Sequence, residues 1–361
     1  MPHYHPSTVS ADLHLAWRAI AHFLGEPAPL PSPLDPELLA EVARVHRLEG
    51  ALAEPRLTPS SPEPHVPRTI WMRWQAAHAA GLAQAVRRAG PLRAALAALA
   101  PIPAVVLKGA ALAELVYPSP GARGMGDVDL LVPREQLPAA LVKLAALGYA
   151  RKYPGHPVLD HPEFHERQLE GPLELDLHQA FIQPERLAID YSAVFDRAVP
   201  WLALGPNALL LSPEDAVVYA CLHAAIGELT PTWAPAVGLL DLRLLLGRVG
   251  ALWGELGPAL EPGVVPVRAR EWGAERMLYA TLGLARRVFP SLPTERLSPH
   301  LGGTLERLLD AAIVGRAFPP PLVDPARIEV VFRKTLRLRP ADRVRFAFHT
   351  IMRRMGWGES R

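Results

Sequence analysis

Short apolar runs rich in β-branched residues alternate with helical patterns through the middle of this 361-residue chain. Val105 to Leu107 is one such run, and it predicts a buried strand. The strand pattern breaks at Gly109, and Ala110 to Val116 has the composition of a helix. A second run, Asp127 to Val132, lies between a glycine and a proline and again has the pattern of a strand. The region therefore predicts strand, helix and strand in this order.

A further helix and a hairpin are predicted in the segment that follows. Glu135 to Leu147 has a helical pattern that ends at Gly148, and residues 149–153 form a short strand-like run. Residues 164–169 and 173–178 are two more strand-like runs, and the Glu-Gly-Pro sequence between them predicts a hairpin. In the second arm leucines alternate with polar residues, so one face is apolar and the other carries Glu174, Asp176 and His178.

Helical patterns separated by prolines occupy the two ends of the chain. The N-terminal part predicts helices at 11–24, 36–52 and 70–99. Asp35 is the expected N-cap of the second helix, and Gly90-Pro91 is expected to interrupt the third. After residue 204 the pattern predicts helices at 216–226, 236–246, 267–288, 303–317 and 326–336.

The predicted fold class is α+β, with a small mixed-sheet core flanked by N-terminal and C-terminal helical domains. We expect a helical region over residues 1–100, the core over 101–200 and a helical domain with a basic tail over 201–361. Half of the residues are hydrophobic and 20% are charged, which provides for a sizeable core and excludes global disorder. The net charge of +2 indicates no particular class of partner.

Cysteine content and hydropathy indicate a cytoplasmic protein. Cys221 is the only cysteine, which excludes an intramolecular disulfide, and its apolar helical surroundings predict a buried, inert thiol. The longest apolar stretch, Ala94 to Leu107, is interrupted by prolines and is too short for a transmembrane helix. The N-terminus has no basic patch followed by an apolar run, so no signal peptide is predicted.

Two carboxylates at the start of the second predicted strand are the first candidates for chemistry. Asp127 and Asp129 point to the same face of that strand, about 7 Å apart along the chain. Carboxylates placed in this way repel each other unless a cation lies between them, and Mg²⁺ prefers such oxygen ligands together with substrate phosphates. The alternative is a solvated strand end with no ligand.

Asp176, on the polar face of the hairpin, is the candidate third carboxylate. The alternative is a half-buried hairpin whose polar face lies in water. His178 is expected to orient Asp176 or to contact substrate. The histidines between 156 and 178 also raise the alternative of a zinc site, although no cysteine accompanies them and they lie in a proline-rich loop. His223 and Asp241 are expected either to line a cleft or to form part of the core.

Lys108 precedes the glycine turn and is one of only four lysines among 38 basic residues. The order Leu-Lys-Gly-Ala, then Pro-Gly-Ala-Arg-Gly-Met-Gly-Asp-Val-Asp-Leu-Leu-Val, resembles the nucleotidyltransferase superfamily, and most of all its uncharacterised nucleotidyltransferase branch. The Leu-Asp-Leu-His segment resembles a downstream strand of the same family. This resemblance implies metal ligands at Asp127, Asp129 and Asp176. It also implies phosphate contacts from Lys108, Gly109 and Arg123.

The activity implied by the resemblance is the transfer of a nucleoside monophosphate from an NTP such as ATP, with Mg²⁺ or Mn²⁺ as cofactor. The acceptor hydroxyl belongs to a small molecule, a peptide or protein, or an RNA end. One alternative is phosphoryl transfer by the same site, as in a kinase. Another is a non-catalytic binding or scaffold protein that retains the fold.

The C-terminal segment has a charge of its own. Residues 327–361 contain ten basic and three acidic residues, a local charge of +7 that leaves −5 for the rest of the chain. A basic amphipathic helix within residues 343–355 would suit an anionic partner such as RNA, an anionic lipid or an acidic protein. The alternative is an ordinary solvated helix.

Overall fold

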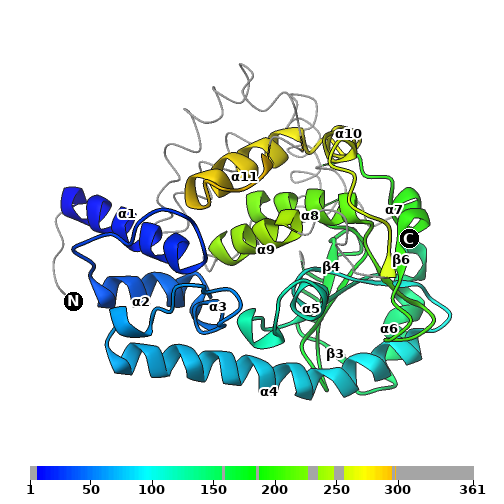
Figure 1. The fold of residues 1–361 in the computed structure, drawn as a ribbon. Coiled ribbons are helices and arrows are strands. Elements are labelled where there is room, and N and C mark those ends of the chain that lie inside the picture. The colour runs from blue at the N-terminus through cyan, green and yellow to red at the C-terminus, as the bar shows by residue number, and fades with distance from the viewer. Residues whose placement is uncertain are drawn as a thin grey trace.

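A helical region and a mixed sheet lie side by side in the structure, a computed structural model (Figure 1). It describes residues 6–156, 159–183, 187–226, 235–247, 256–294 and 297. The predicted helices at 303–317 and 326–336 and the basic segment 327–361 lie outside the described residues. The α+β fold class is confirmed, since helices precede the first strand and follow the last strand along the chain. The division into three domains stays a prediction.

The N-terminal region consists of helices α1 (Pro6–Phe23), α2 (Pro36–Val45), α3 (Glu49–Leu52) and α4 (Arg68–Leu99), with a 3₁₀ turn, η1 (Glu63–His65). Asp35 caps α2 as expected, because its carboxylate accepts hydrogen bonds from the backbone N–H groups of Glu37 and Leu38. The expected interruption of the third helix is wrong, since α4 continues through Pro91. Apolar side chains beyond the proline, such as Leu96 and Leu99, are fully buried, and this packing offsets the hydrogen bond lost there.

Seven strands form one mixed sheet in the order β3-β4-β5-β2-β1-β7-β6. Their bounds are β1 (Ala104–Val106), β2 (Val128–Leu131), β3 (Ala150–Arg151), β4 (Glu166–Glu170), β5 (Leu175–His178), β6 (Val199–Pro200) and β7 (Ala208–Leu210). The predicted hairpin is confirmed, since β4 and β5 are antiparallel neighbours. Two strands far apart in sequence, β2 and β5, pair in parallel. That pairing brings together the two segments that carry the candidate carboxylates.

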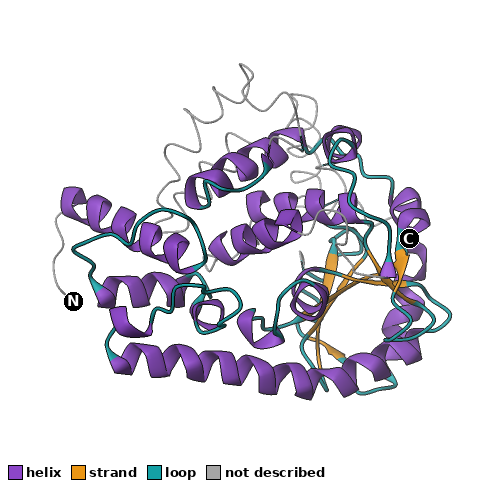
Figure 2. Ribbon diagram, viewed as in Figure 1, coloured by secondary structure: helices purple, strands orange, loops and turns teal. Residues whose placement is uncertain are grey.

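Helices and turns connect the strands and cover the sheet. Between β1 and β3 lie α5 (Lys108–Leu115), η2 (Pro120–Ala122), η3 (Arg134–Gln136) and α6 (Leu137–Ala145), and α7 (Tyr191–Arg197) precedes β6. The chain then continues as α8 (Pro213–Ile226), α9 (Pro235–Gly247), α10 (Val264–Glu271) and α11 (Glu275–Val288). Figure 2 shows the strands gathered on one side of the molecule, with α4 extending beneath both the helical region and the sheet. Buried hydrophobic side chains from all these regions form one core cluster.

Three glycines hold the loop before β2 against the N-terminal helices. Gly50 of α3 and Gly81 of α4 each pack against the backbone of Gly121 of η2. A Cβ atom on Gly50 or Gly121 would overlap a neighbouring oxygen, and one on Gly81 would be tightly crowded. At Gly121, for example, it would lie 2.5 Å from the carbonyl oxygen of His78. The close approach places the segment that follows η2, with Arg123 and Asp127, beside the sheet. Among the described helices, none has the length and apolar character needed to cross a bilayer.

Candidate active site

Asp129 and Asp176 lie opposite each other on the parallel strands β2 and β5. Their side chains are buried, with residue exposures of 4% and 6%, so the predicted alternatives of a solvated strand end and a wet hairpin face are wrong for these two residues. One ligand atom from each, together with one from His178, lies within 4.8 Å of the others. Among the residues that the structure describes, no other three aspartate, glutamate, histidine or cysteine side chains bring their ligand atoms this close together. The expected alternative of a zinc site built from the neighbouring histidines is therefore not seen there.

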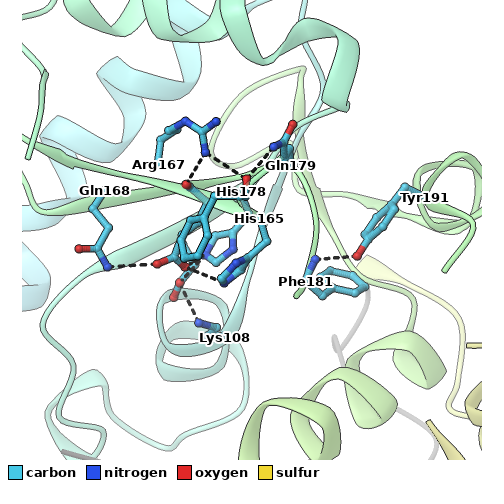
Figure 3. Close-up of polar contacts among 11 residues, drawn as sticks. Lys108, His165, Arg167, Gln168, His178, Gln179, Phe181 and Tyr191 are labelled. Carbon is cyan, nitrogen blue, oxygen red and sulfur yellow. Dashed lines mark hydrogen bonds and ion pairs between the residues drawn. The ribbon is translucent and has the colours of Figure 1, made fainter. Parts of the chain in front are cut away.

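Two donors converge on a single oxygen of Asp129. Lys108 Nζ donates to Oδ1 at 2.9 Å, and His178 Nε2 donates to the same atom, also at 2.9 Å. Figure 3 shows Lys108 beside a helix and His178 on the sheet above it. Burial by itself would raise the pKa of Asp129, but the charge of Lys108 and the hydrogen bond from His178 hold that pKa well below its usual range. Asp129 is therefore ionised, and His178 orients Asp129 rather than Asp176.

Asp176 has the opposite electrostatic environment. Burial, reinforced by the negative charges of Glu166 and Asp129, raises the pKa of Asp176 to about 8. The neighbouring ammonium and imidazole groups thus neutralise one carboxylate but not the second. A buried carboxylate without sufficient counter-charge is what a divalent cation would neutralise, and oxygen donors suit Mg²⁺ or Mn²⁺. The residues present fit such an ion.

Glu166 is a third buried carboxylate that the sequence analysis did not select. It lies on β4 directly opposite His178, 7% exposed, with Oε2 3.7 Å from His178 Nε2 and 3.4 Å from His165 Nε2. Gln168 Nε2 donates to the other carboxylate oxygen of Glu166 at 3.1 Å. The hairpin was predicted, but Glu166 and His178 face each other only through its register, which the turn sequence alone did not specify. Glu174 of the same hairpin is exposed and pairs with Lys152.

Asp127 lies just before β2 and is half-buried. It is outside the group of three ligand atoms, although its charge contributes to the raised pKa of Asp176 and acts on Arg88 of α4. The expected alignment of Asp127 and Asp129 on one strand face does not apply as stated, because the strand begins only at Val128.

Arg123 makes a different contact from the expected one. Its Nε and Nη2 donate to the two carboxylate oxygens of Asp241 at 2.8 and 2.7 Å, and the Tyr117 hydroxyl donates to Oδ1 of Asp241 at 2.8 Å. A Cβ atom on Gly109 would overlap the remaining guanidinium nitrogen of Arg123. Gly109 is therefore needed for the close approach of Arg123 to α5. The guanidinium group is bound within the protein rather than presented to a phosphate.

A pocket lies between α5, α8 and α9, and Lys108, the partner of Asp129, forms part of its wall. It encloses about 490 Å³, open space at its mouth included, and is lined by apolar side chains together with Lys108, Arg123, Tyr219, His223 and Asp241. Apolar walls with a few polar groups among them are typical of small-molecule sites. Both expectations for Asp241 hold, since it lines the pocket and is also a satisfied polar partner in the core. Lys108 both lines the pocket and contacts the buried carboxylate of Asp129.

The backbone at Lys108 is strained. Its φ angle is +44°, in the left-handed region that a residue with a Cβ atom rarely adopts, and α5 begins at this residue. Such a conformation costs on the order of 1–3 kcal/mol and persists where the surrounding structure requires it. Here it directs the lysine into the space between the sheet and the pocket.

Comparisons with known proteins agree with the sequence motif. A family profile described as uncharacterised nucleotidyltransferase matches residues 32–290. No match was found among curated protein sequences. A solved structure, the antibiotic-resistance factor ANT(2'')-Ia, is 20% identical over 45% of this chain and 84% of its own, with a TM-score of 0.31. That similarity is too low to support an argument about the site.

Proposed function

Because the chain belongs to the family of uncharacterised nucleotidyltransferases, which are transferases, we propose that it transfers a nucleoside monophosphate from an NTP to an acceptor hydroxyl. In this reaction the acceptor hydroxyl gives up its proton and its oxygen forms a bond to the α-phosphorus. The bond from this phosphorus to the bridging oxygen breaks, and pyrophosphate leaves. The observation that carries the proposal is the buried pair of carboxylates, Asp129 and Asp176, side by side on parallel strands.

We assign the metal-ligand role to Asp127, Asp129 and Asp176. Bound Mg²⁺ or Mn²⁺ would supply charge neutralisation on the phosphates and lower the pKa of the attacking hydroxyl. The grouping of Asp129 and Asp176 within 4.8 Å supports their assignment. For Asp127 the support is its position two residues before Asp129 and its electrostatic interaction with Asp176.

The surrounding residues position these carboxylates and bind phosphate. His178 holds the Asp129 carboxylate through its Nε2–H, which fixes the orientation of a ligand before substrate arrives. Lys108 and the backbone of Gly109 bind phosphate oxygens, because an ammonium group and N–H groups at a helix start stabilise negative charge. Arg123, expected to join them, instead holds the loop between α5 and β2 through Asp241.

The test is a transfer assay with each NTP labelled separately at the α- and γ-phosphate, with Mg²⁺ or Mn²⁺ and with hydroxyl-bearing small molecules, peptides and RNA as acceptors. Label from the α position on the acceptor, together with released pyrophosphate, is the expected result. Label from the γ position would replace the proposal with phosphoryl transfer. If NTP and cation bind without either transfer, the protein is a binding protein that retains the fold.

A matched pair of variants shows whether the site performs the reaction. Asp176→Asn should abolish transfer, because it removes a carboxylate from the buried group. Glu174→Gln should not, because Glu174 lies two residues away on the same hairpin but is exposed and pairs with Lys152. Equal activity in the two variants would place the chemistry elsewhere.

A further inference from the structure

Lys108 donates a hydrogen bond to the oxygen of Asp129 that a bound cation would approach. Its Nζ lies 2.9 Å from Oδ1 of Asp129, and its side chain is only 12% exposed. A divalent cation held between Asp129 and Asp176 would lie close to this ammonium group, and positive charges repel strongly in a buried site. Either the ammonium group leaves Asp129 when a cation binds, or the cation is excluded.

The pocket between α5, α8 and α9 offers Lys108 a second position, since the lysine already lines its wall. Arg123, Asp241 and His223 lie on the same wall. The wall contains one carboxylate, Asp241, and both of its oxygens accept hydrogen bonds from Arg123. Because Arg123 and Asp241 neutralise each other, an ammonium group that Lys108 moves here from Asp129 would give the wall an uncompensated positive charge. Such a charge, in otherwise apolar surroundings, favours an anion that the surroundings shield from water.

We propose that this pocket is an anion site for a phosphate-bearing ligand, and that Lys108 completes it after a divalent cation has replaced the ammonium group on Asp129. The inference rests on the proposed function only in taking the carboxylates as a cation site. It adds an order of binding, cation first and phosphate second, and a location for the phosphate. The polyphosphate of an NTP and the pyrophosphate product share this chemistry.

The position of Lys108 can be followed directly by NMR. Lysine labelled with ¹³C at Cε gives four protein signals, because the chain contains Lys108, Lys143, Lys152 and Lys334 alone, and single Lys→Arg variants assign them. Saturating Mg²⁺ should shift the Lys108 signal, and pyrophosphate added with Mg²⁺ should shift it again. Lys152, paired with the exposed Glu174, serves as the internal control and should not respond. A Lys108 signal that neither Mg²⁺ nor pyrophosphate moves would overturn the proposal.

Two carboxylate variants test the exchange in the absence of metal. At pH 9, above the pKa of about 8 of Asp176, Asp129→Asn and Asp176→Asn each remove one negative charge, but only the first removes the partner of Lys108. In EDTA, Asp129→Asn should bind pyrophosphate about tenfold more tightly than the wild type, as expected for one added charge-assisted contact. Asp176→Asn should stay within about twofold of the wild type. Equal gains would mean that pyrophosphate senses net charge alone, and Lys108 would then have no part in the anion site.

Filling the pocket with a larger side chain tests whether the anion binds there. Ala220 of α8 lines the pocket, so Ala220→Phe should abolish the response of Lys108 to pyrophosphate while its response to Mg²⁺ remains. Ala220→Ser, which leaves the space open, should retain both responses. A pyrophosphate response that survives Ala220→Phe would place the anion outside the pocket.

Repeating the titration with inorganic phosphate, and with an NTP whose α–β bridging oxygen is replaced by a methylene group, separates the possible sources of the phosphate. A response to the NTP analogue and to pyrophosphate but not to inorganic phosphate assigns the site to the polyphosphate of the nucleotide. These results stand apart from the transfer assay. Absence of any transfer with an intact Lys108 response would reject nucleotidyl transfer and keep the anion site.

Discussion

Two buried charge clusters meet at the start of α5, and they differ in how completely their charges are paired. In the first, Arg123 donates to both oxygens of Asp241, and Tyr117 donates to one of them. One positive charge meets one negative charge, and every carboxylate oxygen has a donor. This cluster is balanced, so it can hold α5, η2 and α9 together without a ligand.

The second cluster contains more carboxylates than its donors neutralise. Asp129, Asp176 and Glu166 are all buried, while Lys108 and His178 both donate to Asp129. The pKa of Asp176 is consequently raised to about 8. Burying carboxylates without sufficient counter-charge costs stability, and a bound cation would remove the cost. The difference indicates that the first cluster stabilises the fold, and it supports the proposal that the second binds a cation.

The largest predicted effect comes from breaking the balanced cluster. Asp241→Asn leaves the buried guanidinium group of Arg123 without its counter-charge, which should lower the free energy of unfolding by about 3–5 kcal/mol. Asp176→Asn removes a repelled carboxylate and should not lower this free energy in EDTA. Urea unfolding of the two variants measures the contrast, with an unchanged m-value as the control. A loss for Asp176→Asn as large as for Asp241→Asn would show that the clusters do not differ as described.

Turnover should respond in the opposite way. Asp176→Asn should lower single-turnover nucleotidyl transfer by on the order of a hundred- to a thousandfold, with a much smaller change in NTP affinity, because its contribution is greatest in the transition state. Glu174→Gln is the control on the same hairpin. Equal losses in affinity and in turnover would mean that Asp176 binds the ground state only.

His46 lies outside both clusters and shows the effect of burial alone, because burial is the only cause of its pKa shift. Its side chain packs against Trp17, and burial lowers the pKa of His46 to about 4. The unfolded chain takes up this proton near pH 6.5, so the stabilising effect is complete above pH 6.5 and is lost as the pH falls toward 4. The loss should approach about 3 kcal/mol.

The measurement for His46 is the free energy of unfolding between pH 7 and pH 4.5. His46→Leu should remove this part of the pH dependence, whereas His65→Leu, at an exposed position, should leave it unchanged. Were the two variants to show the same pH dependence, burial of His46 would not be its source.

The smallest effect is expected at Gly109, where the two clusters meet. A Cβ atom in Gly109→Ala would overlap the Arg123 guanidinium group, which Asp241 prevents from moving away freely. The predicted cost is about 1–2 kcal/mol in the free energy of unfolding. Gly90→Ala is a control, because a Cβ atom there meets nothing within 4 Å. A comparable loss at Gly90 would indicate an effect of helix substitution rather than of the overlap.

Local pattern was sufficient for much of the fold and for part of the site. The strands around Val105 and Leu130, the hairpin that carries Asp176, and the cap at Asp35 all follow from features within a few residues of each other. The buried thiol of Cys221 was predicted in the same way and is confirmed, since the residue is fully buried. The motif also predicted the nucleotidyltransferase family correctly.

The sequence failed where the partner of a side chain lies far away in the chain. Arg123 was expected at the phosphates because the motif resembles nucleotidyltransferases, whereas in the structure it pairs with Asp241, 118 residues further on. The interruption at Gly90-Pro91 was expected from local propensity, which the packing of α4 overrides. Glu166 was missed because a strand pattern does not specify which residues of a hairpin lie opposite each other.

The sequence by itself therefore determined the elements, the family and the residue types available for catalysis, because periodicity, capping and the motif act over short distances. Only the tertiary structure decided which charges meet. The pairing of β2 with β5 places Asp129 beside Asp176. Asp241 of α9 neutralises Arg123, whereas Asp176 is left without sufficient counter-charge. The physical reason is that electrostatic interactions depend on distance and burial in space, and neither is contained in the local order of residues.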